Sequence, residues 1–175
     1  MKLATRQPVP NLSVSTLDGP TWALDQQAVE NFTMVVFYRG LHCPKCKLSL
    51  TELNRKAGEF AELGVGIIAV SCDGEDRART ARDDWKLTNL TIGYGLSIEE
   101  ARAWGLYIST SNGVTSIGVE EPELFCEPGL FVIQPDGNLY MTAIQSMPFA
   151  RPLFAEVAPA IKFVLEKGYP ARGEA

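Results

Sequence analysis

The sequence contains very little histidine and no cluster of basic residues. His42 is the only histidine in 175 residues, and 16 Lys and Arg are outnumbered by 21 Asp and Glu, which gives a net charge of −5. Proteins that bind nucleic acid usually carry a basic patch that contacts the phosphates. The composition therefore argues against a nucleic-acid partner.

Long hydrophobic runs are also absent. The longest ones include MVVF and VGIIAV, which have the length of β-strands, whereas a helix that spans a bilayer needs about 20 apolar residues. The N-terminal residues MKLATRQPVPNL lack the apolar stretch of a secretory signal. We therefore expect no membrane attachment and a cytoplasmic location, where thiols are normally reduced.

The few cysteines form neither a disulfide framework nor an evident zinc site. They comprise one CxxC pair, Cys43 and Cys46, and two single residues, Cys72 and Cys126. Structural zinc sites usually have two such pairs, or one pair followed by two spaced histidines. The single histidine, His42, is adjacent to Cys43 and badly placed to bind the same ion. We therefore expect neither a metal nor a bound cofactor.

Two apolar runs and the segment between them predict a strand–helix–strand unit. Residues 33–38 and 65–71 are apolar and rich in β-branched residues, as in strands that are buried on both faces. Between them, apolar residues recur at steps of four and three, which is typical of one face of a helix. These residues are Cys46, Leu50, Leu53, Ala57 and Phe60.

The rest of the chain extends this pattern to a single α/β domain, residues 1–175, with a mixed sheet. Residues 107–128 have no clear period and are expected to form a long loop. The final helix should bury Leu153, Val157 and Ile161. The other expected elements are a hairpin that turns at Asp18-Gly19, a charged helix at 75–87, a short strand at 90–95, a helix at 97–106 capped by Ser97, a hairpin at 129–145 and the final helix at 151–168.

The predicted topology puts Cys43 at the N-terminus of a helix, just past a buried strand. Pro44 suits the first helical position, where its missing N–H costs nothing. Free N–H groups and the helix dipole stabilise a thiolate there. Cys46 is one turn further on and begins the apolar stripe. We therefore predict an exposed, nucleophilic Cys43 with a low pKa, and a covered Cys46 within disulfide reach, as dithiol redox chemistry requires. Positive charge is expected nearby from Arg39, His42, Lys45 and Lys47.

Two segments resemble the peroxiredoxin-like AhpC/TSA family of the thioredoxin fold. VVFYRGLHCPKCKLSLTEL is similar to the active-site segment of its CPxC-containing branch, and PGLFVIQPDGNL is similar to its FVIDPDG hairpin. The resemblance implies a thioredoxin-like fold, with a mixed central sheet, helices on both faces and an N-terminal hairpin. It also implies a thiol-dependent oxidoreductase, and it is compatible with a homodimer. Cys43 would attack a peroxide or a disulfide, Cys46 would resolve the product, and an external dithiol such as thioredoxin or glutathione would reduce the resulting disulfide.

Two positions depart from the family pattern. Gly40 stands where peroxide-reducing members carry a threonine or serine, and Pro128 stands where they carry an arginine. Pro128 instead resembles the cis-proline of thioredoxins. Arg39 either supplies the missing cation or forms a structural salt bridge. We therefore expect slow peroxide reduction beside competent disulfide exchange. The alternative is a non-enzymatic redox sensor that binds its partner through residues 107–127.

Three further residues have two interpretations each. If Pro128 faces Cys43, then Cys126 and Glu127 lie near the thiol pair. Glu127 would accept a proton during exchange or, as we favour, would be a surface acid. Cys126 would be an additional resolving thiol or part of the packing. Cys72 follows a buried strand and is interpreted as a filler of the core.

Overall fold

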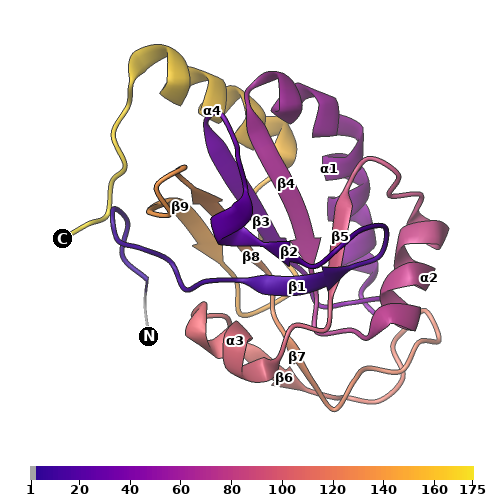
Figure 1. The fold of residues 1–175 in the computed structure, drawn as a ribbon. Helices are drawn as coiled ribbons and strands as arrows, with labels where there is room; N and C mark the ends of the chain where they lie inside the picture. The colour runs from indigo at the N-terminus through magenta and orange to yellow at the C-terminus, as the bar shows by residue number, and fades with distance from the viewer. Residues whose placement is uncertain (1–2) are drawn as a thin grey trace.

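A seven-stranded mixed sheet forms the centre of the computed structural model, which describes residues 3–175 (Figure 1). Its strand order is β2-β1-β5-β4-β3-β8-β9. Strand β3 pairs in parallel with β4, which pairs in parallel with β5, whereas β8 is antiparallel to both β3 and β9. The predicted parallel units and antiparallel hairpin are therefore confirmed. The strands are β1 (Ser13–Thr16), β2 (Trp22–Ala23), β3 (Phe32–Phe37), β4 (Val65–Val70), β5 (Thr91–Tyr94), β8 (Gly129–Ile133) and β9 (Leu139–Ile144).

Helices cover both faces of this sheet, as predicted. Helices α1 (Pro44–Glu62), α2 (Glu75–Trp85) and α4 (Phe154–Lys167) pack on one face, and α3 (Ile98–Ala103) packs on the other. Ser97 caps α3, because its side chain accepts a hydrogen bond from the backbone N–H of Glu100 and the Glu100 side chain accepts one from the backbone N–H of Ser97. The predicted N-terminal hairpin is present as β1 and β2.

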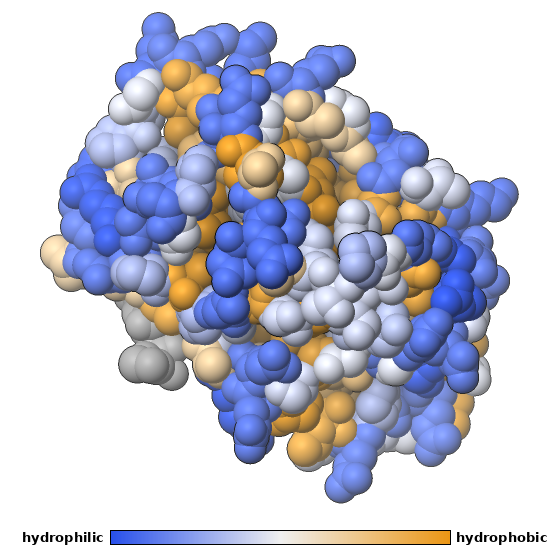
Figure 2. Space-filling model, in the orientation of Figure 1, coloured by the Kyte–Doolittle hydropathy of each residue, from blue (hydrophilic) through white to orange (hydrophobic). Residues whose placement is uncertain are grey.

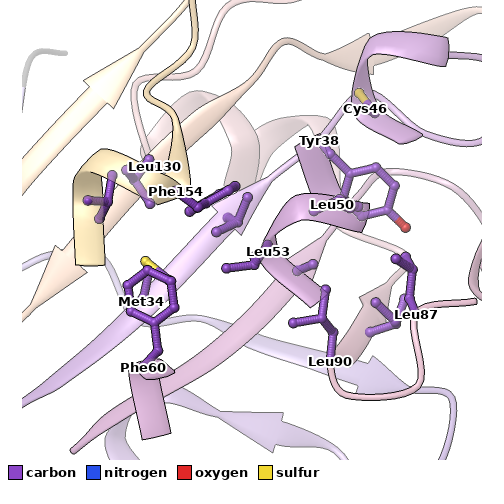
Figure 3. Close-up of a cluster of buried hydrophobic side chains, with 14 of the residues drawn as sticks. Met34, Tyr38, Cys46, Leu50, Leu53, Phe60, Leu87, Leu90, Leu130 and Phe154 are labelled. Carbon is purple, nitrogen blue, oxygen red and sulfur yellow. The ribbon is translucent and has the colours of Figure 1, made fainter. Parts of the chain in front are cut away.

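The larger of two hydrophobic clusters lies between the sheet and α1, α2 and α4. Figure 3 shows part of it, including Met34 and Leu130 from the sheet, Leu53 of α1, and Cys46 near the start of that helix. The predicted stripe on α1 is confirmed, since four of its five members are buried and Ala57 packs against them. The second cluster lies on the opposite face and includes Trp104. The site described below is at the end of the larger cluster.

Residues 107–128 are more ordered than predicted. They contain two short strands, β6 (Ile108–Thr110) and β7 (Leu124–Cys126), which pair antiparallel as a separate two-stranded sheet. Each strand has three residues, which is too short for an alternating pattern to be recognised in the sequence. The prediction of a continuous loop is wrong for these two segments.

The final helix begins later than predicted. Helix α4 starts at Phe154, and Leu153 is its N-cap residue. Phe154 is buried and Leu153 is half exposed, so the predicted position of Leu153 in the buried stripe is wrong, while those of Val157 and Ile161 are confirmed. Arg151 and Pro152 consequently lie in the connection between β9 and α4.

The two ends of the described chain lie close together. Thr5 Oγ1 donates a hydrogen bond to the carbonyl of Arg172, and the Arg6 side chain donates to that of Ala171. In the orientation of Figure 1, most of the surface is hydrophilic, and the apolar areas are small and separate (Figure 2). Within residues 3–175, no helix has the length and apolar character needed to cross a bilayer.

Candidate active site

Cys43 is the N-cap residue of α1, which begins at Pro44 as predicted. Its backbone is extended, and its Sγ atom accepts a hydrogen bond from the backbone N–H of Cys46 at 3.2 Å. This N–H belongs to the first turn of the helix and also donates to the Cys43 carbonyl at 3.0 Å. A thiolate at Cys43 is therefore stabilised by a donor that the helix supplies.

Both cysteines of the CPKC motif are buried. Cys43 and Cys46 each have 0% exposure, and both belong to the larger hydrophobic cluster. The prediction of a covered Cys46 is confirmed, but the prediction of an exposed Cys43 is wrong. A position at the start of a helix is usually accessible, but the connection between β9 and α4 folds against this one. That connection supplies the side chain that contacts both sulfur atoms.

Arg151 is this side chain, and the sequence analysis missed it. Its Nη2 atom lies 3.2 Å from Cys46 Sγ and 3.6 Å from Cys43 Sγ, and its Nε atom donates a hydrogen bond to the carbonyl of Pro148. The one available signal was a lone arginine within the otherwise uncharged segment SMPFARPLF. Arg151, and not Arg39, is therefore the cation that contacts the two sulfur atoms.

The two thiols have opposite pKa shifts. A hydrogen bond from the Cys46 thiol, with the positive charge of Arg151 and the N–H of Cys46, lowers the pKa of Cys43 to about 6 despite its burial. Burial, and then the interaction with the Cys43 sulfur, raise the pKa of Cys46. The predicted order of the two pKa values is confirmed.

Arg39 forms a salt bridge within the framework of the site. Its Nη2 atom lies 3.1 Å from Glu121 Oε1, its Nε atom lies 3.3 Å from Glu127 Oε1, and its guanidinium stacks 4.7 Å from the centre of the Phe125 ring. These contacts favour the structural salt bridge over direct contact with the substrate. The positive charge of Arg39 still contributes to the low pKa of Cys43, but less than the hydrogen bonds from Cys46 and the charge of Arg151 do.

Glu127 is a buried residue, so the favoured interpretation as a surface acid is wrong. It has 3% exposure, and its Oε1 atom accepts a hydrogen bond from Ser109 Oγ at 2.6 Å in addition to its ion pair with Arg39. Both contacts are made by Oε1, and one of them is the ion pair with Arg39. The structure therefore gives Glu127 the role of holding Arg39.

His42 is neutral, which corrects the positive charge expected from the sequence. Its ring is buried and packs edge-on against Phe125, with ring centres 4.6 Å apart. Burial, and the positive charge of Arg39, lower the pKa of His42 to about 4. Of the four cations expected near the thiols, Lys45 and Lys47 are exposed on α1, and Arg39 is ion-paired.

Asp73 explains why glycine occupies position 40. Its buried carboxylate accepts hydrogen bonds from the backbone N–H of Leu41 at 2.7 Å and from Arg77 Nε at 2.8 Å. Gly40 has a φ of +130°, and a Cβ atom there would lie 2.5 Å from Asp73 Oδ2. A threonine at this position would meet both the carboxylate and an unfavourable backbone conformation.

Pro128 is not the cis-proline that the resemblance to thioredoxins implied. No peptide bond within residues 3–175 is cis. Pro128 does lie near the site, because it lines a cavity of about 20 Å³ together with Ser49 and Arg151. This volume is about that of one water molecule.

The other two cysteines are not part of the CPKC cluster. All four cysteines are free thiols. Cys126 is fully buried and donates a weak hydrogen bond from Sγ to the carbonyl of Tyr38, while Cys72 is half-buried. Residues 3–175 contain no group of three or more His, Cys, Asp or Glu side chains that could hold a metal ion.

The family of the chain follows from its sequence and agrees with this geometry. Residues 5–142 match the AhpC/TSA family. The chain belongs to the AhpC/TSA family. Membership places it among oxidoreductases of the thiol peroxidase type, with a thioredoxin-like fold. The matched region ends before Arg151, so the cation that contacts both sulfur atoms comes from outside it.

Solved structures share the fold at low sequence identity. A cysteine-to-serine mutant of peroxiredoxin 6 from Arenicola marina has a TM-score of 0.77 and 18% identity over 95% of this chain and 76% of its own. Peroxidoxin BcpB from Mycobacterium tuberculosis has a TM-score of 0.72 and 18% identity over 94% and 99% of the two chains. AhpC from Mycobacterium tuberculosis has a TM-score of 0.70 and 14% identity over 94% and 99%. No curated protein matches the sequence.

Proposed function

We propose that this protein reduces a hydroperoxide through the CPKC dithiol, with Cys43 as nucleophile and Cys46 as resolving cysteine. The observation that carries the proposal is the opposite pKa shift of two thiols one helical turn apart, with Arg151 in contact with both. At neutral pH, Cys43 is a thiolate and Cys46 retains its proton. The pair is thus ready for two successive displacements, and neither requires a bound cofactor.

In the first displacement, the Cys43 thiolate attacks one oxygen atom of the peroxide. The S–O bond forms as the O–O bond breaks, Cys43 becomes a sulfenic acid, and the departing oxygen leaves as water or an alcohol after it takes up a proton. Negative charge develops on that oxygen atom. The guanidinium of Arg151, 3.6 Å from the sulfur, is a cation that can stabilise this charge.

In the second displacement, the Cys46 sulfur attacks the sulfur of the Cys43 sulfenic acid. A disulfide forms, and hydroxide leaves and takes up the proton of the Cys46 thiol as water. An external dithiol such as thioredoxin or glutathione then reduces the disulfide to two thiols. Because both sulfur atoms are buried, this last step requires the start of α1 or the connection that carries Arg151 to move.

The burial of Cys43 favours a small hydroperoxide as the substrate. Cys43 has 0% exposure, so a small molecule needs a smaller opening to reach its sulfur than the disulfide of a large partner does. Arg151 also supplies the cation whose absence from the sequence motif suggested slow peroxide reduction.

Thiol–disulfide exchange is the second candidate, and Gly40 favours it. The position offers no hydroxyl group to bind the peroxide, and the buried carboxylate of Asp73 excludes one. Exchange requires only a reactive thiolate and a resolving thiol, both of which are present. A cytoplasmic location, where a dithiol reductant is abundant, is part of both proposals.

Turnover assays distinguish the two candidates. The protein is supplied with thioredoxin, its reductase and reduced nicotinamide cofactor, and then with either hydrogen peroxide or a small disulfide. The proposal predicts faster turnover with peroxide than with the disulfide. Cys43→Ser should abolish the turnover with peroxide. In Cys46→Ser, the reaction should stop after Cys43 has been oxidised once. Cys72→Ser, outside the CPKC pair, serves as the matched control. Faster turnover with the disulfide would favour the second candidate. If neither substrate gave turnover that depends on Cys43, both candidates would be wrong, and the non-enzymatic redox sensor would be the remaining interpretation.

A further inference from the structure

The connection between β9 and α4, residues 145–153, forms a strap that lies against the CPKC motif. Arg151 is part of this strap, and its Nη2 atom contacts Cys46 Sγ at 3.2 Å and Cys43 Sγ at 3.6 Å. The two cysteines have 0% exposure. The strap itself has no regular secondary structure, and none of its residues is buried. A thin surface segment thus contacts two buried thiols.

Few contacts hold the strap between its two ends. The backbone N–H groups of Gln145, at its start, and of Ala155, just past its end, donate hydrogen bonds to other parts of the chain. Between these points, within the described part of the chain, only the Arg151 side chain forms hydrogen bonds that join residues 146–152 to another segment. No strap residue belongs to the two hydrophobic clusters that the described residues form. The position of the strap therefore depends on the contact of Arg151 with the sulfur atoms.

The backbone of the strap is strained next to Arg151. Ala150 has a φ of +55°, in the left-handed region that residues with a side chain rarely adopt. Such a conformation persists only where neighbouring contacts hold it. The Ala150 side chain is exposed, so these contacts come from the adjacent Arg151. If the guanidinium lost its partners, the strap would relax from this conformation.

The anion that pairs with Arg151 is the Cys43 thiolate. Within residues 3–175, no carboxylate forms an ion pair with this guanidinium, and its remaining hydrogen bond goes to the carbonyl of Pro148 in the strap itself. The guanidinium is half-buried and keeps its charge at any pH at which the protein is folded. A disulfide between Cys43 and Cys46 carries no negative charge. Its formation therefore leaves a half-buried cation without an anion, which is unfavourable.

We propose that the strap responds to the redox state of the CPKC pair. The Cys43 thiolate holds the strap in place through Arg151, and formation of the Cys43–Cys46 disulfide releases it and opens the sulfur atoms to the external dithiol. The movement that reduction of the disulfide requires is thus a movement of the strap and not of the start of α1. The inference rests on the proposed dithiol chemistry, but it does not depend on peroxide as the substrate.

The test compares the reduced and oxidised protein by NMR. The full chain carries Cys72→Ala and Cys126→Ala, so that Cys43 and Cys46 are the only thiols. Diamide oxidises them to the disulfide, and its N=N bond takes up the two electrons and two protons. Backbone order parameters are measured for the strap residues 146–151 that have an N–H, and for the first turn of α1. On oxidation we expect those of the strap to fall below about 0.6, and those of α1 to stay near about 0.85.

Two further variants test the role of the guanidinium. When Arg151→Met is added, the strap should be flexible in the reduced protein already, and oxidation should cause no further change. Lys45→Met is the matched control, because Lys45 Nζ lies 5.9 Å from the centre of the Phe149 ring in the strap and is the other cation in contact with it. This variant should behave as the parent does in both redox states. Circular dichroism confirms that each variant is folded.

The proposal is overturned if the strap has the same order parameters in the reduced and oxidised parent, or if the loss of order occurs in the first turn of α1 instead. It is also overturned if the strap stays ordered in reduced Arg151→Met. A different result would contradict the dithiol function itself: peptide mapping would show that diamide leaves Cys43 and Cys46 unlinked. The failure of the strap proposal and the failure of the proposed function are therefore distinguishable.

Discussion

The guanidinium of Arg151 contacts both sulfur atoms of the CPKC motif, at 3.2 Å from Cys46 Sγ and 3.6 Å from Cys43 Sγ. These residues are more than a hundred positions apart in the chain. The guanidinium is partly buried and lies beside fully buried sulfur atoms. Its interaction with a thiolate is therefore stronger than that of a surface cation.

Replacing Arg151 should slow the first chemical step. In Arg151→Met, Cys43 loses a cation and the departing oxygen loses a charged donor. We therefore expect the pKa of Cys43 to rise and the rate of its oxidation by peroxide to fall on the order of a hundredfold. Stopped-flow measurement of Cys43 oxidation at several pH values gives both quantities. Arg39→Met is the matched control, and its effect on the rate should be smaller because Glu121 and Glu127 hold this guanidinium. An equal or larger effect of Arg39→Met would contradict the role given to Arg151.

The two cysteines of the motif should differ in reactivity with an alkylating agent. Since the pKa of Cys43 is about 6, its alkylation rate should rise through a midpoint near that pH and be almost constant above neutrality. Cys46 should be unreactive at neutral pH, because burial raises its pKa. Peptide mapping after brief labelling separates the two residues. Faster labelling of Cys46 than of Cys43 at neutral pH would reverse the assignment of their roles.

The sequence contained the local part of this site. The helix start at Pro44 and the buried positions of Cys46 and Leu50 depend on neighbours three or four residues away, so a spacing pattern predicts them. The order of the two thiol pKa values follows from the same local geometry. The hairpins and the parallel strands were likewise predictable from runs of apolar residues and turn residues.

The residues that the sequence did not reveal act across long separations. Arg151 reaches the thiols through a connection whose path depends on how α4 packs. The burial of Glu127 depends on the pairing of β6 with β7, and these strands have three residues each. Local composition carries no information on such contacts. The predicted positive charge of His42 was wrong for the same reason, because the pKa of this residue depends on burial by residues distant in sequence.

His42 offers a direct measurement of this burial. It is the only histidine in the chain, so its imidazole signals in a proton NMR titration need no assignment. We expect a pKa of about 4, since burial and the charge of Arg39 disfavour the protonated ring. Arg39→Met should move it upward. A wild-type value near 6.5, which is usual for an exposed histidine, would show that the ring is accessible to water.

The lowered pKa of His42 makes the stability of the protein depend on pH. In the unfolded chain His42 binds its proton near pH 6.5, whereas in the folded chain it does so near pH 4. Between these values the unfolded state carries more protons, so the free energy of unfolding falls as the pH is lowered from 6.5 to 4. Above pH 6.5 the ring is neutral in both states and contributes no pH dependence. Urea unfolding should show a smaller loss of stability between pH 7 and pH 5 in His42→Gln than in the wild type.

A threonine at position 40 should damage the site even though peroxide-reducing relatives carry a hydroxyl residue there. The new Cβ atom would lie 2.5 Å from the buried Asp73 carboxylate, and the backbone φ of +130° is unfavourable for any residue with a side chain. We expect Gly40→Thr to lower the free energy of unfolding by about 2–4 kcal/mol. It should also slow oxidation of Cys43 by peroxide, because relief of the clash displaces Asp73 from the backbone N–H of Leu41.

Gly95→Ala is the matched control for this substitution. Its φ of +74° is also positive, but no atom lies within 4 Å of the added Cβ, so only the backbone conformation is penalised. Gly95→Ala should lower the free energy of unfolding by about 1 kcal/mol and leave the rate of Cys43 oxidation unchanged. Urea unfolding and stopped-flow oxidation measure both quantities for each variant. A Gly40→Thr protein as stable as the control and faster with peroxide would mean that Asp73 can move aside and that the site accepts a hydroxyl donor. The sequence-based expectation that Gly40 limits peroxide reduction would then be correct, and the inference that Asp73 enforces this glycine would be wrong.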